Sequence, residues 1–202
     1  MSELSILMAV RMKGRVDAAG VAACAGIDTD VAAEALADLL AREIVTGGPQ
    51  YRITKDGKEA LAAMVAKERE GIDHEGLSAA YHDFDAVNTA LKAAITAWQI
   101  REDGTPNDHT DPDYDGKVID KIHRVHRKFG PVLDRTIELV PRLAQYRVRF
   151  DAALDKIDEG DAAYVARPIL DSYHTVWFEY HEELIGLLGL SRAEEAAAGR
   201  AE

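Results

Sequence analysis

Two histidines three residues apart are the clearest candidate for metal chemistry in this sequence. His123 and His126 lie in a segment expected to be helical, so they project about 60° apart around the helix axis. Both imidazoles could therefore ligate one ion. Histidines that cap or bridge helices give the same pattern, and the chain has no Glu-x-x-His pair of the di-iron kind. A metal site is therefore one hypothesis for these two histidines, and capping or bridging of helices is the simpler alternative.

The same segment contains a cluster of basic residues in an otherwise acidic half of the chain. At about 100° per residue, they fall opposite the apolar positions Ile122 and Val125, on the solvent side of the helix. The four are Lys121, Arg124, Arg127 and Lys128. They could pair with the acidic residues 102–116, with a partner, or with an anionic ligand that Arg124 and Arg127 would contact. A solvated face with intramolecular ion pairs is the alternative.

A third candidate is a small ligand cavity. Asn88 falls inside an otherwise apolar helical stripe and needs hydrogen-bond partners if it is buried. It could line a cavity together with Tyr81 and Trp98. It could instead fix the register of packed helices, which is the interpretation we favour.

The segment DPDYDG (111–116) imitates the start of a calcium-binding EF-hand loop. Ile122 stands where that loop needs a bidentate acid, so calcium binding is not expected. We expect the segment to form turns and to cap a helix that starts near Lys117.

No enzymatic motif accompanies these residues. The chain has no G-x-S-x-G, no Walker loop, no G-x-G-x-x-G and no clustered thiols, since Cys24 is its one cysteine. We therefore expect a protein that is not an enzyme and that needs no cofactor.

The composition limits the class of protein. Of 202 residues, 47% are hydrophobic, which argues against disorder, and the net charge of −12 disfavours a protein that wraps nucleic acid or binds a membrane surface. The longest charge-free run has ten residues, whereas a membrane span needs about 20. The start of the chain lacks the basic region of a secretory signal, and a single cysteine suits a reducing compartment. We expect a cytoplasmic protein without a membrane partner.

Charge also divides the chain. Residues 1–70 carry nine basic and 11 acidic groups, a balance of −2, whereas residues 71–202 carry 15 and 25, a balance of −10. We therefore predict a first domain over residues 1–70 and a second over residues 71–190. Residues 191–202 are expected to be a frayed tail.

The first domain has the element order of a winged helix-turn-helix. Caps at Ser2, at Asp17 and at Asp28 or Thr29 begin three helices, and GGP (47–49) turns between two short strands before Thr54 begins a fourth helix. The third helix is expected to bury Val31, Leu36, Leu39 and Leu40.

A winged helix usually places that third helix in the major groove of DNA. Thr29 and Ala33 are then the candidate base contacts, and four cations near the wing are candidate phosphate contacts: Arg42, Arg52, Lys55 and Lys58. Three carboxylates on the same helix repel phosphate and are a poor set for reading bases: Asp30, Glu34 and Asp38. The alternative is a winged helix that binds protein.

The second domain is expected to be a bundle of three or four long helices, so the chain as a whole is mainly α. Apolar stripes run through residues 77–98 and 118–129, with breaks expected at residues 130–131, at Pro141 and at residues 160–161. Pro168 is expected to kink the last helix or to begin it. That helix is expected to bury Val165, Ile169, Tyr173, Val176, Tyr180 and Leu187.

Through residues 4–61, and most of all at YRITKDG (51–57), the chain resembles MarR-like bacterial winged-helix regulators. The resemblance implies a dimer that binds double-stranded DNA and whose helical region also binds small molecules. The acidic third helix departs from the pattern of that family.

At AWQIR (97–101), NDHTDPDYD (107–115) and DSYHTVWFEYHEEL (171–184), the chain is similar to a helical module of bacterial pyruvate phosphate dikinase-like proteins. The swivelling domains of those phosphoenolpyruvate-utilising enzymes carry a Thr-Gly-Gly run closely followed by a phosphorylated histidine. Here Thr46 begins such a run, but the next histidine is His74. No catalytic residue is therefore carried over.

These observations lead to two functional predictions. The first is a transcription-regulator-like winged-helix protein, a homodimer whose helical domain serves dimerisation or sensing. The second is a non-catalytic accessory module that acts on a phosphotransfer enzyme of the dikinase-like class. A metal- or ligand-binding helical protein is a third possibility.

Overall fold

A computed structural model describes residues 2–197, which are mainly helical with one small antiparallel sheet. The chain divides into two compact units, the first ending at Ile72 and the second beginning at Asp73. We call them the N-terminal unit and the helical unit. None of the helices within the described range is long and apolar enough to cross a membrane.

Side-chain caps begin the helices of the N-terminal unit where the sequence predicts them. Ser2, Asp17 and Thr54 accept hydrogen bonds from backbone N–H groups three residues on, at 3.3, 2.8 and 3.0 Å. Asp28 precedes α3 without a side-chain bond. The elements are α1 (Glu3–Lys13), α2 (Ala18–Ala25), α3 (Thr29–Ala41), β1 (Val45–Gly47), β2 (Tyr51–Ile53) and α4 (Lys55–Arg69).

The small sheet ties the first and last parts of this unit together. β1 and β2 are antiparallel, and Val16 adds a bridge on the other side of β2, where its N–H and C=O bond to Tyr51 at 3.1 and 2.7 Å. A Cβ on Gly57 would lie 2.1 Å from the carbonyl oxygen of Ile44. Only glycine therefore lets the start of α4 lie this close to the chain entering β1.

The buried face of α3 differs from the predicted one. Leu36 and Leu39 are buried, together with Ala32 one turn earlier, whereas Val31 and Leu40 are 38% and 39% exposed. The three buried side chains span an arc of about 60°, and α1, α2 and β1 pack against α3. Val31 and Leu40 flank this arc on opposite sides, so both are left partly exposed.

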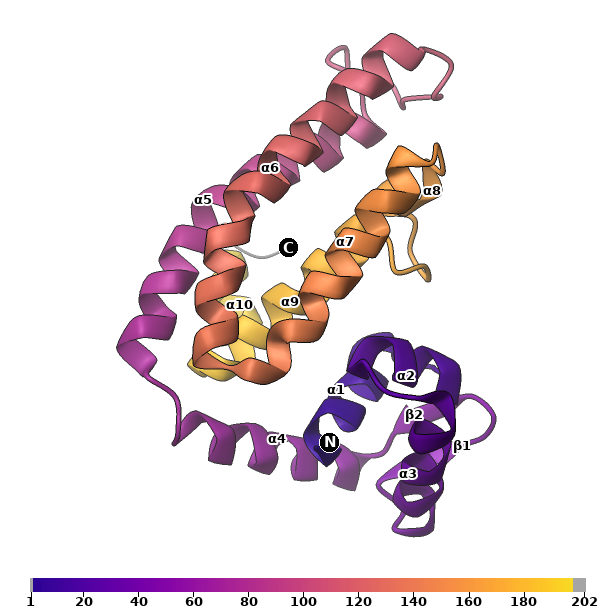
Figure 1. Ribbon diagram of the computed structural model, residues 1–202, viewed down its shortest axis with the longest axis vertical. Coiled ribbons are helices and arrows are strands. Elements are labelled where there is room, and N and C mark those ends of the chain that lie inside the picture. The colour runs from indigo at the N-terminus through magenta and orange to yellow at the C-terminus, as the bar shows by residue number, and fades with distance from the viewer. Residues whose placement is uncertain (1, 198–202) are drawn as a thin grey trace. The chain divides into compact units, whose positions relative to one another are not determined.

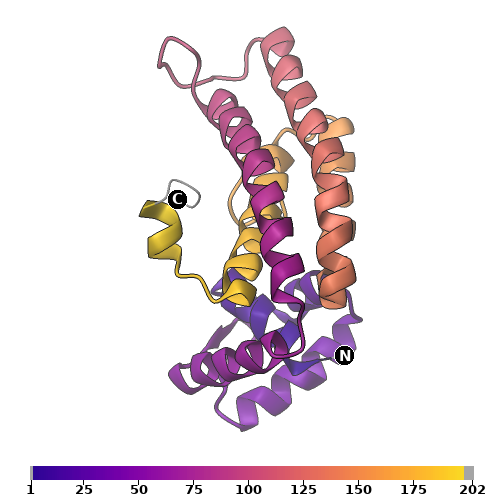
Figure 2. The same cartoon turned by 90° about the vertical axis from the view of Figure 1, so that its left-hand side faces the viewer.

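Four long helices build the helical unit. α5 (His74–Gln99) and α6 (Pro112–Leu139) run antiparallel side by side (Figures 1 and 2), and α9 (Tyr173–Leu188) packs against α5 and α7 (Ala144–Asp158). The short elements are η1 (Pro141–Leu143), α8 (Ala163–Ala166) and α10 (Arg192–Ala197).

An aromatic cluster joins these four helices. The ring centroid of Phe129 on α6 lies 6.1 Å from Phe84 on α5 and 5.1 Å from Phe150 on α7. It lies 4.5 Å from Trp177 and 5.2 Å from Tyr180, both on α9. One fully buried ring therefore contacts all three neighbouring helices.

Helix α6 is longer at both ends than the sequence predicts. It begins at Pro112, where Asp111 accepts a hydrogen bond from the N–H of Tyr114 at 3.0 Å, so five of the six residues expected to form turns (111–116) are helical. It also continues through Pro131, where a break was expected. A proline inside a helix costs about 3 kcal/mol. Burial of Phe129, Val132 and Leu133 around it offsets that cost.

The last long helix begins later than expected. Pro168 restricts Arg167 to an extended conformation, so α8 ends there and Ser172 caps a separate α9. Ile169 lies in the connection with a φ of 79° and is 98% exposed, so its predicted burial is wrong. In the segment expected to fray, residues 192–197 form α10. Residues 198–202 of that segment lie outside the described part.

We expect Phe129→Ala to lower the free energy of unfolding of the helical unit by about 3–5 kcal/mol, because it removes a buried ring from contacts with three helices. Val148→Ala on α7, at a side chain that is 70% exposed, is the matched control and should change it by less than about 0.5 kcal/mol. Urea unfolding, monitored by tryptophan fluorescence, measures this free energy, since both tryptophans lie in the helical unit. Equal effects of the two substitutions would contradict the assigned core.

Candidate functional site

The outer face of α3 is acidic, and the arginine at the end of this helix is already bonded to carboxylates. Asp30, Glu34 and Asp38 are exposed on it. Arg42, at the C-cap, donates to both carboxylate oxygens of Glu3 at 2.8 and 3.0 Å and to Asp38 at 3.0 Å. These contacts raise the pKa of Arg42 and occupy its guanidinium. The predicted phosphate contact at Arg42 would have to break a bidentate pair between α1 and α3.

Three more of the predicted DNA contacts are exposed. Thr29 and Ala33 lie on the first turns of α3, on the same outer surface as its carboxylates. Lys55 lies 3.8 Å from Glu59 one turn along α4. Of these three, only Lys55 carries a positive charge, and it is paired with Glu59.

Two cations meet on the wing. Arg52 on β2 is exposed, and the antiparallel bridge between Val16 and Tyr51 places Arg15 opposite it. Lys58 is exposed at the start of α4. Among the carboxylates that the structure describes, none lies within 4.0 Å of the charged atoms of Arg15, Arg52 or Lys58. Sequence reasoning missed Arg15, because its place beside Arg52 depends on a bridge between distant segments.

Helix α9 carries charge into the core of the helical unit. Glu179 is 3% exposed and accepts a hydrogen bond from Arg149 on α7 at 2.5 Å. Arg149, itself 6% exposed, also donates to Asp171 at 2.9 and 3.0 Å. Because one guanidinium is shared by two carboxylates, this cluster fixes α7 against the start and the middle of α9.

One turn further along α9, Glu183 is also buried. Its Oε1 accepts from Arg142 at 2.8 Å and from the hydroxyl of Tyr146 at 3.4 Å. Burial, and the negative charge of Glu183, raise the pKa of Tyr146 well above its ordinary value. The phenol therefore stays protonated and serves as a donor.

A third buried group on α9 is His181, which links α5 to α10. The hydroxyl of Tyr81 donates to Glu195 at 2.6 Å and lies 2.9 Å from Nε2 of His181. Because that hydroxyl proton goes to Glu195, Nε2 of His181 must carry a proton and donate to Tyr81. Burial lowers the pKa of His181 to about 4, so the ring is neutral.

The residues predicted to line a ligand cavity do not come together. Asn88 is 3% exposed and accepts from the indole N–H of Trp177 at 2.9 Å. Trp98 packs against His109, with 4.3 Å between ring centroids. Along α5, Asn88 lies about 10 Å from Tyr81 and about 15 Å from Trp98. Each of the three side chains has a partner of its own in the packed bundle.

The two histidines proposed as metal ligands face different partners. Nε2 of His123 lies 2.9 Å from Asp158, while His126 lies 3.5 Å from Asp151 and 3.3 Å from the hydroxyl of Tyr173. Burial lowers the pKa of His126. In the described part of the chain, no group of three or more His, Cys, Asp or Glu is arranged to hold a metal ion. The geometry favours bridging of α6 to α7 and α9.

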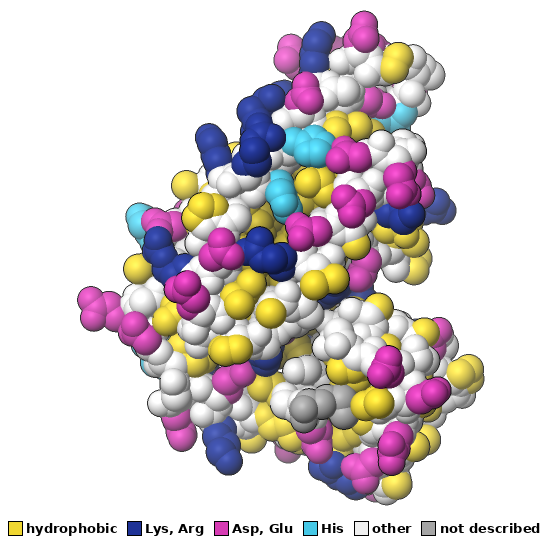
Figure 3. Space-filling view, in the orientation of Figure 1, with side chains coloured by type: hydrophobic (Ala, Val, Ile, Leu, Met, Phe, Trp, Pro, Cys, Tyr) yellow, Lys and Arg dark blue, Asp and Glu magenta, His cyan; other side chains and the backbone are white. Residues whose placement is uncertain are grey.

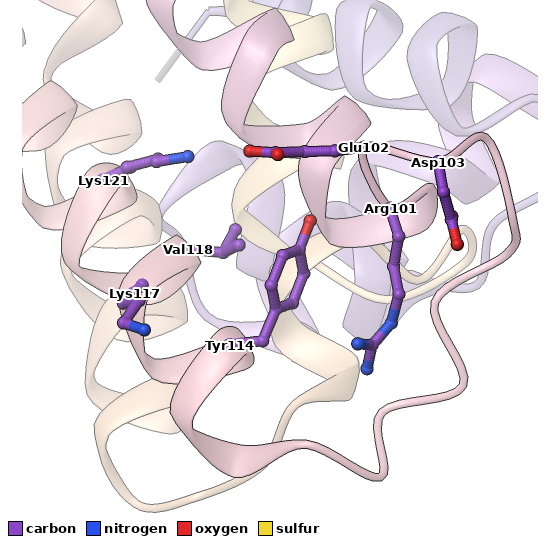
Figure 4. Close-up of a pocket in the computed structure, with 7 residues that line it drawn as sticks. All are labelled: Arg101, Glu102, Asp103, Tyr114, Lys117, Val118 and Lys121. Atoms are coloured by element: carbon purple, nitrogen blue, oxygen red, sulfur yellow. The ribbon is translucent and has the colours of Figure 1, made fainter.

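A surface pocket of about 480 Å³ lies where α5 and α6 meet their connecting loop (Figure 4). Arg101 stands over the ring of Tyr114 with its Cζ 4.9 Å from the centroid, and the hydroxyl of Tyr114 donates to the carbonyl of Ala97 at 2.8 Å. The pocket is lined by Arg101, Glu102, Asp103, Tyr114, Lys117, Val118 and Lys121. Arg124 and Arg127, predicted to bind an anion, are exposed further along α6 and do not line it.

Sequence reasoning missed the buried ionic groups of α9, although a signal for them exists. In the run FEYHEEL (178–184), four Glu and His residues stand among aromatic and apolar ones. A helix with one solvated face keeps its ionisable residues on that side, whereas α9 carries Glu179 and Glu183 on one side and His181 on the other. Such a pattern indicates a helix surrounded by others, whose charges need partners from its neighbours.

Comparison with known proteins finds no match for this chain among protein-family models, curated proteins or solved structures. The function is therefore argued from the residues and their geometry. The two family resemblances stay predictions.

We expect Arg149→Met to lower the free energy of unfolding by about 3–5 kcal/mol, because it leaves the carboxylate of Glu179 buried beside an apolar side chain. The double variant Arg149→Met/Glu179→Met should be less destabilised than the sum of the two single variants, since it removes both charges. Urea unfolding of the four proteins measures the coupling. Additive effects would show that Arg149 and Glu179 do not depend on each other.

The low pKa of His181 predicts a loss of stability in acid. The unfolded chain binds a proton near pH 6.5, whereas the folded chain binds it only near pH 4. Stability from this group is therefore complete above pH 6.5 and falls as the pH drops to 4, by at most about 3 kcal/mol. His181→Gln keeps a donor for Tyr81 but does not titrate, so it should flatten this part of the profile. Identical pH profiles of the two proteins would refute the assignment.

Proposed function

We propose that this chain is a non-enzymatic interaction protein whose N-terminal unit is a winged helix-turn-helix that binds a protein partner through α3. Two features support the winged-helix interpretation. Helices α2 and α3 pack together across the turn at Gly26, whose φ is 66°, and β1 and β2 follow as a hairpin. The bridge from Val16 adds a third strand position beside the hairpin.

The chemistry of α3 carries the proposal. A helix that reads bases needs donors such as Arg, Lys, Asn or Gln, and it must approach phosphates. The outer face of α3 has three carboxylates instead, and Arg42 at its end is bonded to Glu3 and Asp38. This face would repel the DNA backbone.

The same face is suited to a protein surface. Val31 and Leu40 add partly exposed apolar side chains on the two opposite flanks of this face, and the small side chains of Ala33 and Ala37 allow close approach. Apolar contacts surrounded by charge are typical of non-obligate protein interfaces. The helical unit resembles a module of pyruvate phosphate dikinase-like proteins, and this resemblance predicts that the partner is a phosphoenolpyruvate-utilising enzyme. The helical unit is also our candidate for homodimerisation.

A DNA-binding regulator is the second candidate, and the wing favours it. Arg15 and Arg52 lie opposite one another, and Lys58 follows at the start of α4, all exposed. Three cations of this kind could hold the phosphates of a duplex without reading its sequence.

We expect the wild-type protein not to bind a random duplex at low salt, as measured by fluorescence anisotropy. Asp30→Lys/Glu34→Lys should create weak, salt-dependent binding that Arg52→Ala reduces, because the repulsive charge on α3 is removed while the wing remains. Glu159→Lys/Asp161→Lys in the helical unit carries the same change in net charge and should not bind. Tight binding by the wild type that is lost in Arg15→Ala/Arg52→Ala would establish the regulator instead.

Photo-crosslinking tests the protein partner. A crosslinking residue at Ala33 on α3 should capture one defined protein in the native cell, and Asp30→Lys/Glu34→Lys should abolish the crosslink. The matched probe at Ala62, which is exposed on α4, should not capture that protein. Equal capture from both positions would overturn docking through α3.

A further inference from the structure

Four cations form a straight row on α6. Their spacing of four, three and four residues keeps them within an arc of about 60° and extends over about 16 Å of helix. We call this set the cation row, and it consists of Lys117, Lys121, Arg124 and Lys128. All four are exposed, and dark-blue side chains gather over the upper half of α6 in Figure 3.

The cation row contrasts with most basic side chains of its own unit. Among the described residues Arg127 and Arg167 also have no carboxylate within 4.0 Å, but seven other basic side chains do: Arg101, Arg135, Arg142, Arg147, Arg149, Lys156 and Arg192. No described carboxylate is that close to a member of the row, although Asp113 and Asp120 lie on its flank. Like charges one turn apart repel each other, so four of them in sequence leave a site for an anion.

The pocket lies at the N-terminal end of the row. Lys117 and Lys121 belong to both, while Val118 and the ring of Tyr114 supply apolar surface between them. In Figure 4, the side chains of Lys121 and Glu102 point toward one another from opposite walls. The Asp103 carboxylate is held away by Thr105, whose hydroxyl donates to it at 2.7 Å. The volume of about 480 Å³ lies within the usual range for small-molecule sites.

We propose that the pocket and the cation row form one binding site for an organic polyphosphate, such as a nucleoside triphosphate. The organic group would lie in the pocket against Tyr114 and Val118, and the phosphates would extend along Lys117, Lys121 and Arg124. Successive members of the row are about 4.5–6 Å apart along the axis, so neighbouring phosphates can each meet a cation. This goes beyond the proposed function, since no residue of α3 takes part.

The overall charge favours a small ligand over nucleic acid. The helical unit has an excess of ten acidic groups, counted from residue 71 onward. A long polyanion would run past these carboxylates and be repelled. A ligand the size of a nucleotide experiences mainly the local field, because more distant charges are screened beyond about 8 Å.

Isothermal titration calorimetry with ATP, pyrophosphate and adenosine tests the proposal. ATP should bind, pyrophosphate should bind more weakly, and adenosine should show no heat, since the phosphates supply most of the attraction. Lys117→Gln/Lys121→Gln should weaken ATP binding by at least about tenfold. Glu102→Gln should tighten it, because it removes a negative charge from the pocket wall; a residue that only supports the fold would not have this effect.

A control variant removes two positive charges elsewhere in the same unit. Lys156→Gln/Arg167→Gln alters exposed residues outside the row and should leave ATP binding unchanged within about twofold. If both double variants weakened ATP binding equally, net charge alone would explain the effect and the proposed site would be wrong. Absence of ATP binding by the wild type, or binding of duplex DNA or heparin alone through the row, would equally reject a nucleotide ligand.

Discussion

Helix α9 is surrounded by other helices, and the arrangement of the helical unit follows from the charges it buries. Each buried polar group pairs with a different element: the carboxylate of Glu179 with Arg149 on α7, the carboxylate of Glu183 with Arg142 in η1, and the neutral ring of His181 with Tyr81 on α5. A buried charge without its partner destabilises a protein by several kcal/mol, so packings that separate Glu179 from Arg149 or Glu183 from Arg142 are disfavoured. The aromatic cluster around Phe129 supplies cohesion, while the charges of α9 select the geometry.

This internal pairing also shapes the outer surface. Arg142 and Arg149 are taken into the core, and Arg135 and Arg147 are paired at the surface. The cations of α6 therefore remain on one exposed face, although the unit as a whole is acidic. In the N-terminal unit, internal pairing leaves the opposite charge exposed. Arg42 is bonded by carboxylates, and the exposed face of α3 is therefore negative. The charge that each unit exposes thus follows from which charges are paired internally.

Much of the local structure could be predicted because it depends on neighbours in the chain. The caps at Ser2, Asp17 and Thr54 and the hairpin at Gly47 require only nearby backbone groups. The solvent-facing side of α6 was also predictable from periodicity. The errors arise where distant contacts override local preference. Burial of flanking apolar residues carries α6 through Pro131, and Ile169 is exposed because Pro168 interrupts the helix that would have buried it.

The sequence by itself determined the two-part, mainly helical organisation, the positions of most helix ends and the contrast in charge between the parts. It did so because capping, periodicity and composition act over a few residues. Only the tertiary structure decided which charged groups are neutralised and which remain exposed. Arg42 and Arg52 look alike in the sequence, yet Glu3 binds the first while the second stands beside Arg15. Electrostatic pairing depends on distance in space, so the functional surfaces emerge only after folding.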